Sequence, residues 1–123
     1  MCGFIGKLSY SDFDLDSLEK PNELLVCRGP DSKKSLKGDL STYFDGDFSL
    51  NCSIIFNRLS IIDLSDMANQ PMISKTHKTL IVFNGEIYNH NELRKELEAK
   101  GLEFTTDHSD TEVALLGLSH FGN

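Results

Sequence analysis

The apolar residues change their spacing along the chain, and this change constrains the fold more than any other feature. Before residue 84 they form short strand-like runs, the last of which is the continuous apolar segment 79–83. After it come two helical patterns, one at 91–100 and one that starts at Ser109. Strands and helices therefore do not alternate in regular βαβ units, and we predict an α+β fold.

The strands are predicted from alternation and from β-branched or apolar content. We expect them at 2–10, 53–56, 59–62 and 79–83. The segment 79–83 is apolar throughout, so we expect both of its faces to be covered. The acidic segment 11–20 predicts a loop with one helical turn, and Arg28–Asp31 predicts a turn. The polar segment 33–47 predicts a loop, with at most a short strand at 42–44.

Both helices carry signals at their ends. Asn91 is expected to cap the first helix, Glu96 and Lys100 to pair one turn apart, and Gly101 to end it. The second helix begins with the capping-box pattern of Ser109 and Glu112.

Composition limits the classes of function. The 123 residues fit one domain, and the net charge of −7 disfavours nucleic acid and anionic membranes as partners. The sequence has no long apolar run and no secretion signal, so we expect a cytoplasmic protein with free thiols. Its three cysteines lack C-x-x-C spacing, and we expect no metal site.

Cys2 directly follows Met1. If Met1 is removed, one residue carries both a thiol and a free α-amine. A free α-amine has a pKa of roughly 7.7–8.0, so at neutral pH it is partly unprotonated and can accept a thiol proton. Nucleophile and base then come from one residue. The alternative is a buried, inert cysteine at the start of a strand.

Six motifs occur in an order that identifies a resemblance. They are MCGFIG at 1–6, RGPD at 28–31, RLSIIDLS at 58–65, QPM at 70–72, NGEIYN at 84–89 and SDTE at 109–112. Together they resemble the glutamine-hydrolysing domain of class II glutamine amidotransferases, in the asparagine synthetase branch. The resemblance covers nearly the whole chain.

The resemblance implies an N-terminal nucleophile hydrolase fold, a four-layer αββα sandwich with antiparallel sheets. It implies hydrolysis of L-glutamine to glutamate and ammonia through a thioester on Cys2. Ammonia would pass to an ATP-using synthetase domain of the full-length protein, which by default makes asparagine from aspartate. Family members continue past the SDTE helix, so we expect 1–123 to be an incomplete amidotransferase domain without the synthetase domain.

The resemblance also assigns roles to residues. Cys2 would be the nucleophile, and Asn84 with the backbone N–H of Gly85 would stabilise the oxyanion. Arg58 would bind the substrate carboxylate, and Asp110 with Glu86 the α-ammonium group. The remaining assignments are the backbone of Leu59, Ser60, Ile61 and Ile62 as a pocket wall, and Arg28 and Asp31 as supports of the loop over Cys2. The alternatives are a plain turn at Asn84–Gly85, an edge-strand charge at Arg58 and a helix-dipole acid at Asp110.

Two positions depart from the family pattern: Cys27 stands where the family usually has His, and Asn57 where it often has a basic residue or His. No cofactor is expected in this chain, since ATP and magnesium would belong to the synthetase domain. An incomplete sheet would expose edges, so we expect self-association, measurable by light scattering. The competing hypotheses are a non-catalytic fragment or glutamine-binding module, and a metal or redox protein.

Overall fold

The computed structural model describes residues 2–61 and 64–122. The chain divides after Leu59 into two compact units, an N-terminal and a C-terminal one. Helices occur with antiparallel sheets, so the predicted α+β class is confirmed. No helix among the described residues has the length and apolar character needed to cross a membrane.

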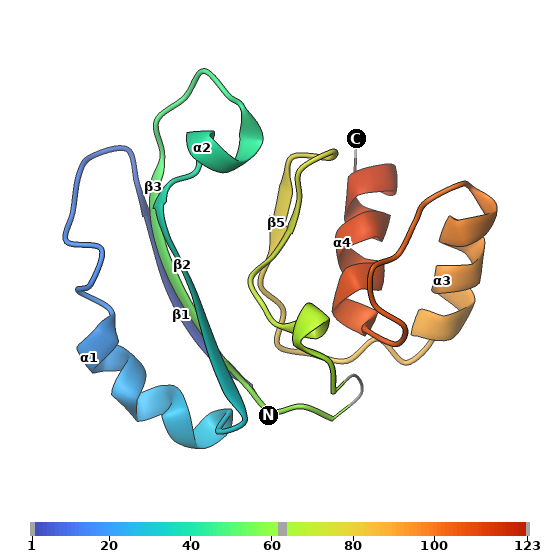
Figure 1. The fold of residues 1–123 in the computed structure, drawn as a ribbon, viewed down its shortest axis with the longest axis horizontal. Coiled ribbons are helices and arrows are strands. Elements are labelled where there is room, and N and C mark those ends of the chain that lie inside the picture. The colour runs from blue at the N-terminus through green and yellow to red at the C-terminus, as the bar shows by residue number, and fades with distance from the viewer. Residues whose placement is uncertain (1, 62–63, 123) are drawn as a thin grey trace. The chain divides into compact units, whose positions relative to one another are not determined.

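The N-terminal unit is built on a three-stranded antiparallel sheet. Its strands are β1 (Gly3–Ser9), β2 (Ser32–Asp39) and β3 (Asn51–Arg58), in the order β1-β3-β2. They run side by side in Figure 1. The register pairs Gly3 with Asn57 and Ser32 with Arg58. The strands predicted at 2–10 and 53–56 are therefore confirmed, and the start of β1 lies beside the end of β3.

The prediction of a loop at 33–47 is wrong. Most of β2 falls there, and Thr42–Phe44 belongs to the short helix α2 (Ser41–Phe44) rather than to a strand. β2 lies at an edge of the sheet and exposes Lys33 and Lys34. Edge strands favour lysine because charge discourages pairing with another chain. Such a strand therefore lacks the apolar pattern on which the prediction relied. Nothing in the structure tests the self-association expected from exposed sheet edges, which stays a prediction.

One face of β3 is covered by the segment that follows β1. This segment contains α1 (Glu19–Asn22) and the 3₁₀ helix η1 (Glu23–Arg28), so the helical turn predicted within 11–20 extends further than expected. Asn22 and Asn57 are both buried and their side-chain amides bond each other, at 2.6 and 3.4 Å. The hydroxyl of Ser53 donates to the carbonyl oxygen of Leu15 at 2.7 Å. Residues 53 and 57 share a face because side chains alternate along a strand.

The C-terminal unit begins with short elements. They are the 3₁₀ helix η2 (Asp66–Ala68) and the antiparallel pair β4 (Met72–Ser74) and β5 (Thr79–Ile81). Two predictions are corrected here. Leu59–Ile61 is not a strand, and Ile61 is 72% exposed, while Ile62 lies outside the described residues. The segment 79–83 forms only three strand residues, all half-buried, because its partner β4 is equally short.

Two helices complete this unit, α3 (His90–Ala99) and α4 (Asp110–Phe121), which lie side by side in Figure 1. Leu97 of α3 packs with Val113 and Leu116 of α4 in a buried cluster. The predicted Glu96–Lys100 ion pair is present at 3.0 Å. The N-cap of α3 is Asn89 rather than Asn91, and its side chain makes no cap bond.

Candidate active site

Cys2 lies immediately before β1, beside the residue that follows β3. Its sulfur accepts a hydrogen bond from the backbone N–H of Leu59 at 3.3 Å, and its thiol donates to the carbonyl oxygen of Leu59 at 3.6 Å. The side chain is half-buried and the thiol is free. The sheet register explains this contact, because pairing Gly3 with Asn57 brings residue 2 to the end of β3. Cys2 is therefore held by the backbone and remains partly accessible.

The Arg28–Asp31 turn contacts both strand ends. The Nε–H of Arg28 donates to the carbonyl oxygen of Cys2 at 3.2 Å, and the backbone N–H of Asp31 donates to the carbonyl oxygen of Arg58 at 3.0 Å. Gly29 lies against the backbone of Asn57, so closely that a Cβ would overlap its carbonyl group. Only glycine fits such an approach. The turn thus holds the backbone carbonyl groups of both Cys2 and Arg58.

Arg58 ends β3 and is buried. Burying a guanidinium group is costly unless its donors are satisfied by acceptors. A planar fork of N–H donors at a fixed strand end can bind a carboxylate through two hydrogen bonds.

The other two cysteines are in different surroundings. Cys27 is exposed, with its sulfur 3.9 Å from the carbonyl oxygen of Leu24. Cys52 is buried in β3, and burial, followed by the charge of Asp39, raises the pKa of its thiol. The thiolate is the nucleophilic form, so Cys52 is poorly suited to attack a substrate.

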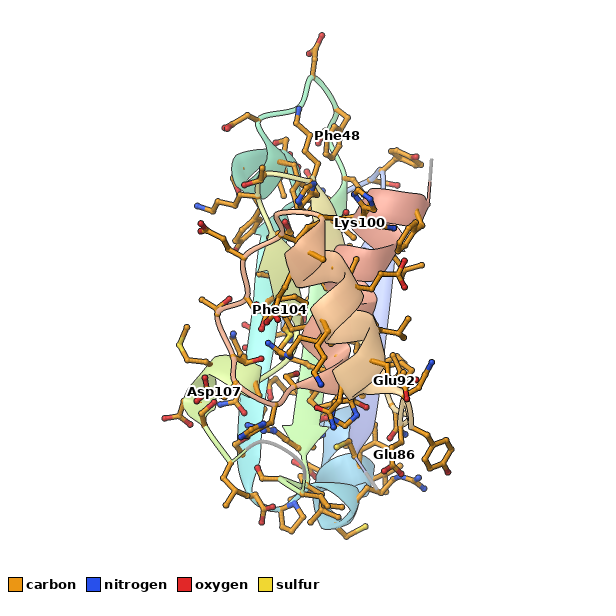
Figure 2. All side chains as sticks on the ribbon, turned by 90° about the vertical axis from the view of Figure 1, so that its right-hand side faces the viewer. Phe48, Glu86, Glu92, Lys100, Phe104 and Asp107 are labelled. Atoms are coloured by element: carbon orange, nitrogen blue, oxygen red, sulfur yellow. The ribbon has the colours of Figure 1, made fainter. Side chains whose placement is uncertain are left out.

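Asn84, Gly85 and Glu86 are exposed on the segment between β5 and α3. Figure 2 shows Glu86 just beyond the end of α3 that carries Glu92. A Cβ on Gly85 would lie 2.6 Å from the ring of Phe83. The ring therefore packs directly on the glycine backbone.

Asp110 begins α4 and is brought to the same segment. Its Oδ2 accepts a hydrogen bond from the backbone N–H of Ile87 at 3.0 Å, and its Oδ1 one from the Thr111 hydroxyl at 3.5 Å. The carboxylate is buried, with 7% of the residue exposed. An acidic group at this end of a helix is also favoured by the helix dipole. Asp110 and the Asn84–Glu86 segment are thus adjoining parts of one local structure.

The start of α4 is further held by a buried polar network. Ser109 caps the helix by accepting the Glu112 N–H at 3.3 Å, as the capping-box pattern predicted. The Glu112 carboxylate does not return to Ser109. It accepts instead from the backbone N–H and hydroxyl groups of Thr105 and Thr106, with both amides at 2.7 Å. Burial raises the pKa of Glu112, but these hydrogen bonds lower it by more, and the net shift is downward.

Arg94 of α3 completes this network. Its guanidinium donates to the carbonyl oxygens of Thr106 at 2.8 Å and Ser109 at 3.4 Å, and lies 4.0 Å from the centre of the Phe104 ring. Figure 2 shows Phe104 beside the helices. Sequence reasoning assigned nothing to Arg94. Its position within the helical pattern was the only available signal, and that pattern does not specify partners in the loop before α4.

The predicted site residues thus fall into two groups. Those of the N-terminal unit are Cys2, Arg28, Asp31, Arg58 and Leu59; those of the C-terminal unit are Ser60, Ile61, Asn84, Gly85, Glu86 and Asp110. Of the predicted pocket-wall residues, Ser60 is half-buried and Ile61 is exposed. Ile62 falls outside the described part of the chain. No group of three His, Cys, Asp or Glu residues suited to a metal ion occurs in the part of the chain that the structure describes.

Comparison with known proteins defines the class. A family model described as a glutamine amidotransferase domain matches residues 1–123. The chain therefore belongs to the family of glutamine amidotransferase domains, as its motifs predicted.

The chain is also similar to individual proteins, among them asparagine synthetases. Asparagine synthetase [glutamine-hydrolyzing] 1 of Bacillus subtilis is 40% identical over 126 residues, which cover 98% of this chain and 18% of the relative. Asparagine synthetase [glutamine-hydrolyzing] 1 of Lotus japonicus is 35% identical over 79% of this chain and 15% of the relative. The Penicillium rubens amidase chyE is 34% identical over 88% of this chain and 14% of its own length. The chain spans less than one fifth of the length of these relatives.

Proposed function

We propose that this domain hydrolyses L-glutamine to glutamate and ammonia, with Cys2 as the nucleophile. The observation that carries the proposal is the half-buried Cys2 sulfur, held by the Leu59 N–H beside the buried Arg58, in a chain of the glutamine amidotransferase family. The hydrogen bonds with the backbone N–H and carbonyl oxygen of Leu59 hold the sulfur in place. The exposed Cys27 and the buried Cys52 lack this combination of access and a backbone donor.

The proposed reaction uses only residues of the chain, glutamine and water. After removal of Met1, the α-amine of Cys2 takes the thiol proton, and the sulfur attacks the side-chain amide carbon of glutamine. The C–N bond then breaks, and the amine returns the proton to the departing nitrogen, which leaves as ammonia. Water attacks the resulting thioester, glutamate leaves, and the thiol is restored.

The other proposed roles follow the charge of the substrate. Asn84 and the backbone N–H of Gly85 stabilise the negative charge that develops on the amide oxygen. The guanidinium of Arg58 binds the α-carboxylate, and the Leu59–Ile62 backbone lines the pocket. The carboxylates of Asp110 and Glu86 bind the α-ammonium group. Arg28 and Asp31 support the strand ends through their contacts with Cys2 and Arg58.

We further propose that residues 1–123 form part of a four-layer αββα sandwich of the N-terminal nucleophile type. The antiparallel three-stranded sheet, whose first strand begins directly after Cys2, supports this proposal. The names of the relatives support transfer of the ammonia to a synthetase domain of the full-length protein, where ATP and magnesium would serve the amidation of aspartate.

Covalent labelling tests the proposed nucleophile. The full-length protein is treated with the glutamine-mimicking electrophile diazo-oxo-norleucine, and its peptides are analysed by mass spectrometry. We expect the label on a Cys2 that has lost Met1, and we expect Cys2→Ser to abolish both the label and glutamate release. Cys27→Ser is the matched control, since Cys27 is the more exposed thiol, and it should behave as the wild type.

Three results contradict the proposal. Glutamate release by Cys2→Ser excludes Cys2 as the nucleophile. Full activity of a protein that retains Met1 excludes the α-amine as the base, because that nitrogen would then be part of a peptide bond. A protein that binds glutamine without releasing glutamate would instead be a glutamine-binding module.

A further inference from the structure

The exposed segment Asn84–Glu86 is held at both of its ends. Downstream, the backbone N–H of Ile87 donates to Asp110 at 3.0 Å. The carbonyl oxygen of Ile87 also lies 2.9 Å from the His90 ring nitrogen Nδ1 and accepts the His90 backbone N–H at 3.1 Å. The downstream anchor therefore includes a residue already assigned to the substrate, Asp110.

The upstream anchor is the side chain of Gln70, a buried residue that precedes Pro71. Its Oε1 accepts the backbone N–H of Phe83 at 2.6 Å, and its Nε2 donates to the carbonyl oxygen of Phe83 at 3.0 Å. The same Nε2 donates to the hydroxyl of Thr111 in α4 at 3.1 Å. The amide thus makes one accepted and two donated hydrogen bonds, and both backbone groups of Phe83 are satisfied by one side chain.

The Gln70 side chain makes the hydrogen bonds that a neighbouring strand would otherwise make with Phe83. β5 ends at Ile81, so Phe83 has no ladder partner in the two-stranded sheet. Buried and half-buried backbone groups need hydrogen-bond partners. The Gln70 amide supplies a donor and an acceptor in the spacing that a neighbouring strand would offer, and it links them to α4.

Phe83 transmits this constraint to Gly85. A Cβ on Gly85 would lie 2.6 and 2.8 Å from two atoms of the Phe83 ring, so ring and glycine backbone are in close contact. When the backbone of Phe83 is held in place, the position of its ring is restricted as well. The ring in turn restricts the position of the Gly85 backbone that it contacts. Asn84 lies between these two residues.

We propose that Gln70 is a positioning residue that holds the Asn84 amide and the Gly85 N–H in place for the oxyanion. The proposal rests on the proposed function, since it concerns the geometry of the same donors. Gln70 acts through Phe83 and does not touch the substrate. Oxyanion donors must be within hydrogen-bond range of the developing charge before reaction, and small displacements weaken them sharply.

The test is a comparison of steady-state glutaminase kinetics in the full-length protein. Gln70→Met keeps the length of the side chain and removes all three hydrogen bonds. We expect kcat to fall roughly 10–100-fold, the range for a small misplacement of catalytic groups, while KM for glutamine stays near the wild-type value. A loss of kcat without a change in KM indicates an interaction made mainly in the transition state.

A matched control separates positioning from stability. Ser119 of α4 donates to the hydroxyl of Thr79 at 3.1 Å, so it also links α4 to β5, and its other hydrogen bond is to the carbonyl oxygen of Leu115 within α4. Ser119→Ala should lower the melting temperature and leave kcat unchanged. Thr111→Val removes the third bond of Gln70 and also the hydrogen bond from Thr111 to Asp110. It should lower kcat less than Gln70→Met does, and any rise in KM is attributed to Asp110.

The outcomes are decisive in each case. Wild-type kcat in Gln70→Met, or an equal loss of kcat in Ser119→Ala, overturns the proposal. If Gln70→Met does not fold, an unchanged kcat in Thr111→Val overturns it. If the wild type releases no glutamate, the proposed function fails by itself. Hydrogen exchange then tests Gln70, since Gln70→Met and not Ser119→Ala should lose protection at Phe83, whose N–H donates to Gln70, and retained protection overturns the positioning role.

Discussion

The sulfur of Cys2 lies 3.3 Å from the backbone nitrogen of Leu59, although the two residues are 57 positions apart in the sequence. Pairing of β1 with β3 produces this contact, because the start of β1 lies beside the end of β3 in this antiparallel register. The side chain of Arg58 belongs to the same strand end. One register therefore positions the proposed nucleophile and the proposed carboxylate-binding residue together, and a shift by one residue would separate them.

Asn84→Ala tests the proposed oxyanion donor. We expect kcat for glutamine hydrolysis to fall roughly 10²–10³-fold, the usual cost of losing one such donor. Stability should change little, because Asn84 is exposed. Asn91→Ala is the control, as it removes another exposed amide seven positions along the chain, and its kcat should stay at the wild-type value. A near-normal rate in Asn84→Ala contradicts the assignment.

Asp110 combines a structural contact with a proposed binding role, and two substitutions separate them. Asn at this position can still accept the Ile87 N–H but carries no charge. We expect Asp110→Asn to raise KM for glutamine roughly 10–100-fold, since hydrogen bonds to charged groups contribute about 1.5–3 kcal/mol. The free energy of unfolding should fall by only ~0.3–1 kcal/mol, through the helix dipole.

Asp110→Ala also removes the acceptor of the Ile87 N–H. It should therefore lower the free energy of unfolding by a further ~1–3 kcal/mol, as for an orphaned buried donor. Asp107→Asn is the control, because Asp107 is an exposed acid in the loop before α4 (Figure 2). Equal KM values for wild type and Asp110→Asn would exclude a role in binding the ammonium group.

The buried Asn22–Asn57 pair is expected to stabilise the N-terminal unit. Removing either amide leaves its partner unsatisfied, so Asn22→Ala and Asn57→Ala should each cost about 1–3 kcal/mol in urea unfolding. The double variant should cost less than the sum of the two, because the second substitution removes the orphaned group. Asn51→Ala, which breaks an exposed bond to Asp12, is the control. Strictly additive losses would show that the pair is not coupled.

Local sequence patterns were sufficient to predict two strands and one helix start. The alternation in β1, the β-branched content of β3 and the cap at Ser109 were all sufficient. β2 could not be predicted, since its lysines suit an edge strand that exists only through pairing with β3. The segment 59–61 failed for the opposite reason, as its apolar residues lie beyond the end of the strand.

The candidate site divides in the same way. Cys2, Arg58, Asn84 and Asp110 came from motifs, whose chemistry can be read from residue type. The Cys2–Leu59 contact and the Gln70–Phe83 bonds depend on sheet register and loop path, for which a sequence has no periodic signal. Asn57 was noted only as a departure from the family pattern, and the structure explains it through its bond to Asn22.

The ion pairs between Glu19 and two lysines of β2 predict an acid-dependent loss of stability. Hydrogen bonds from Lys33 and Lys37, both at 2.6 Å, lower the pKa of Glu19 from 4.5 to about 2. A carboxyl whose pKa is lower in the folded state binds fewer protons there than in the unfolded state. Its contribution to the unfolding free energy is therefore complete above about pH 4.5 and is lost as the pH falls towards about 2.

Glu19→Gln should flatten the pH dependence of the unfolding free energy in this window. The measurement is made at low salt, because the ion pairs are exposed and salt screens them. Glu23→Gln, an exposed acid without an ion pair among the described residues, should keep the wild-type slope. An identical slope in Glu19→Gln and the wild type would show that these ion pairs do not stabilise the folded chain.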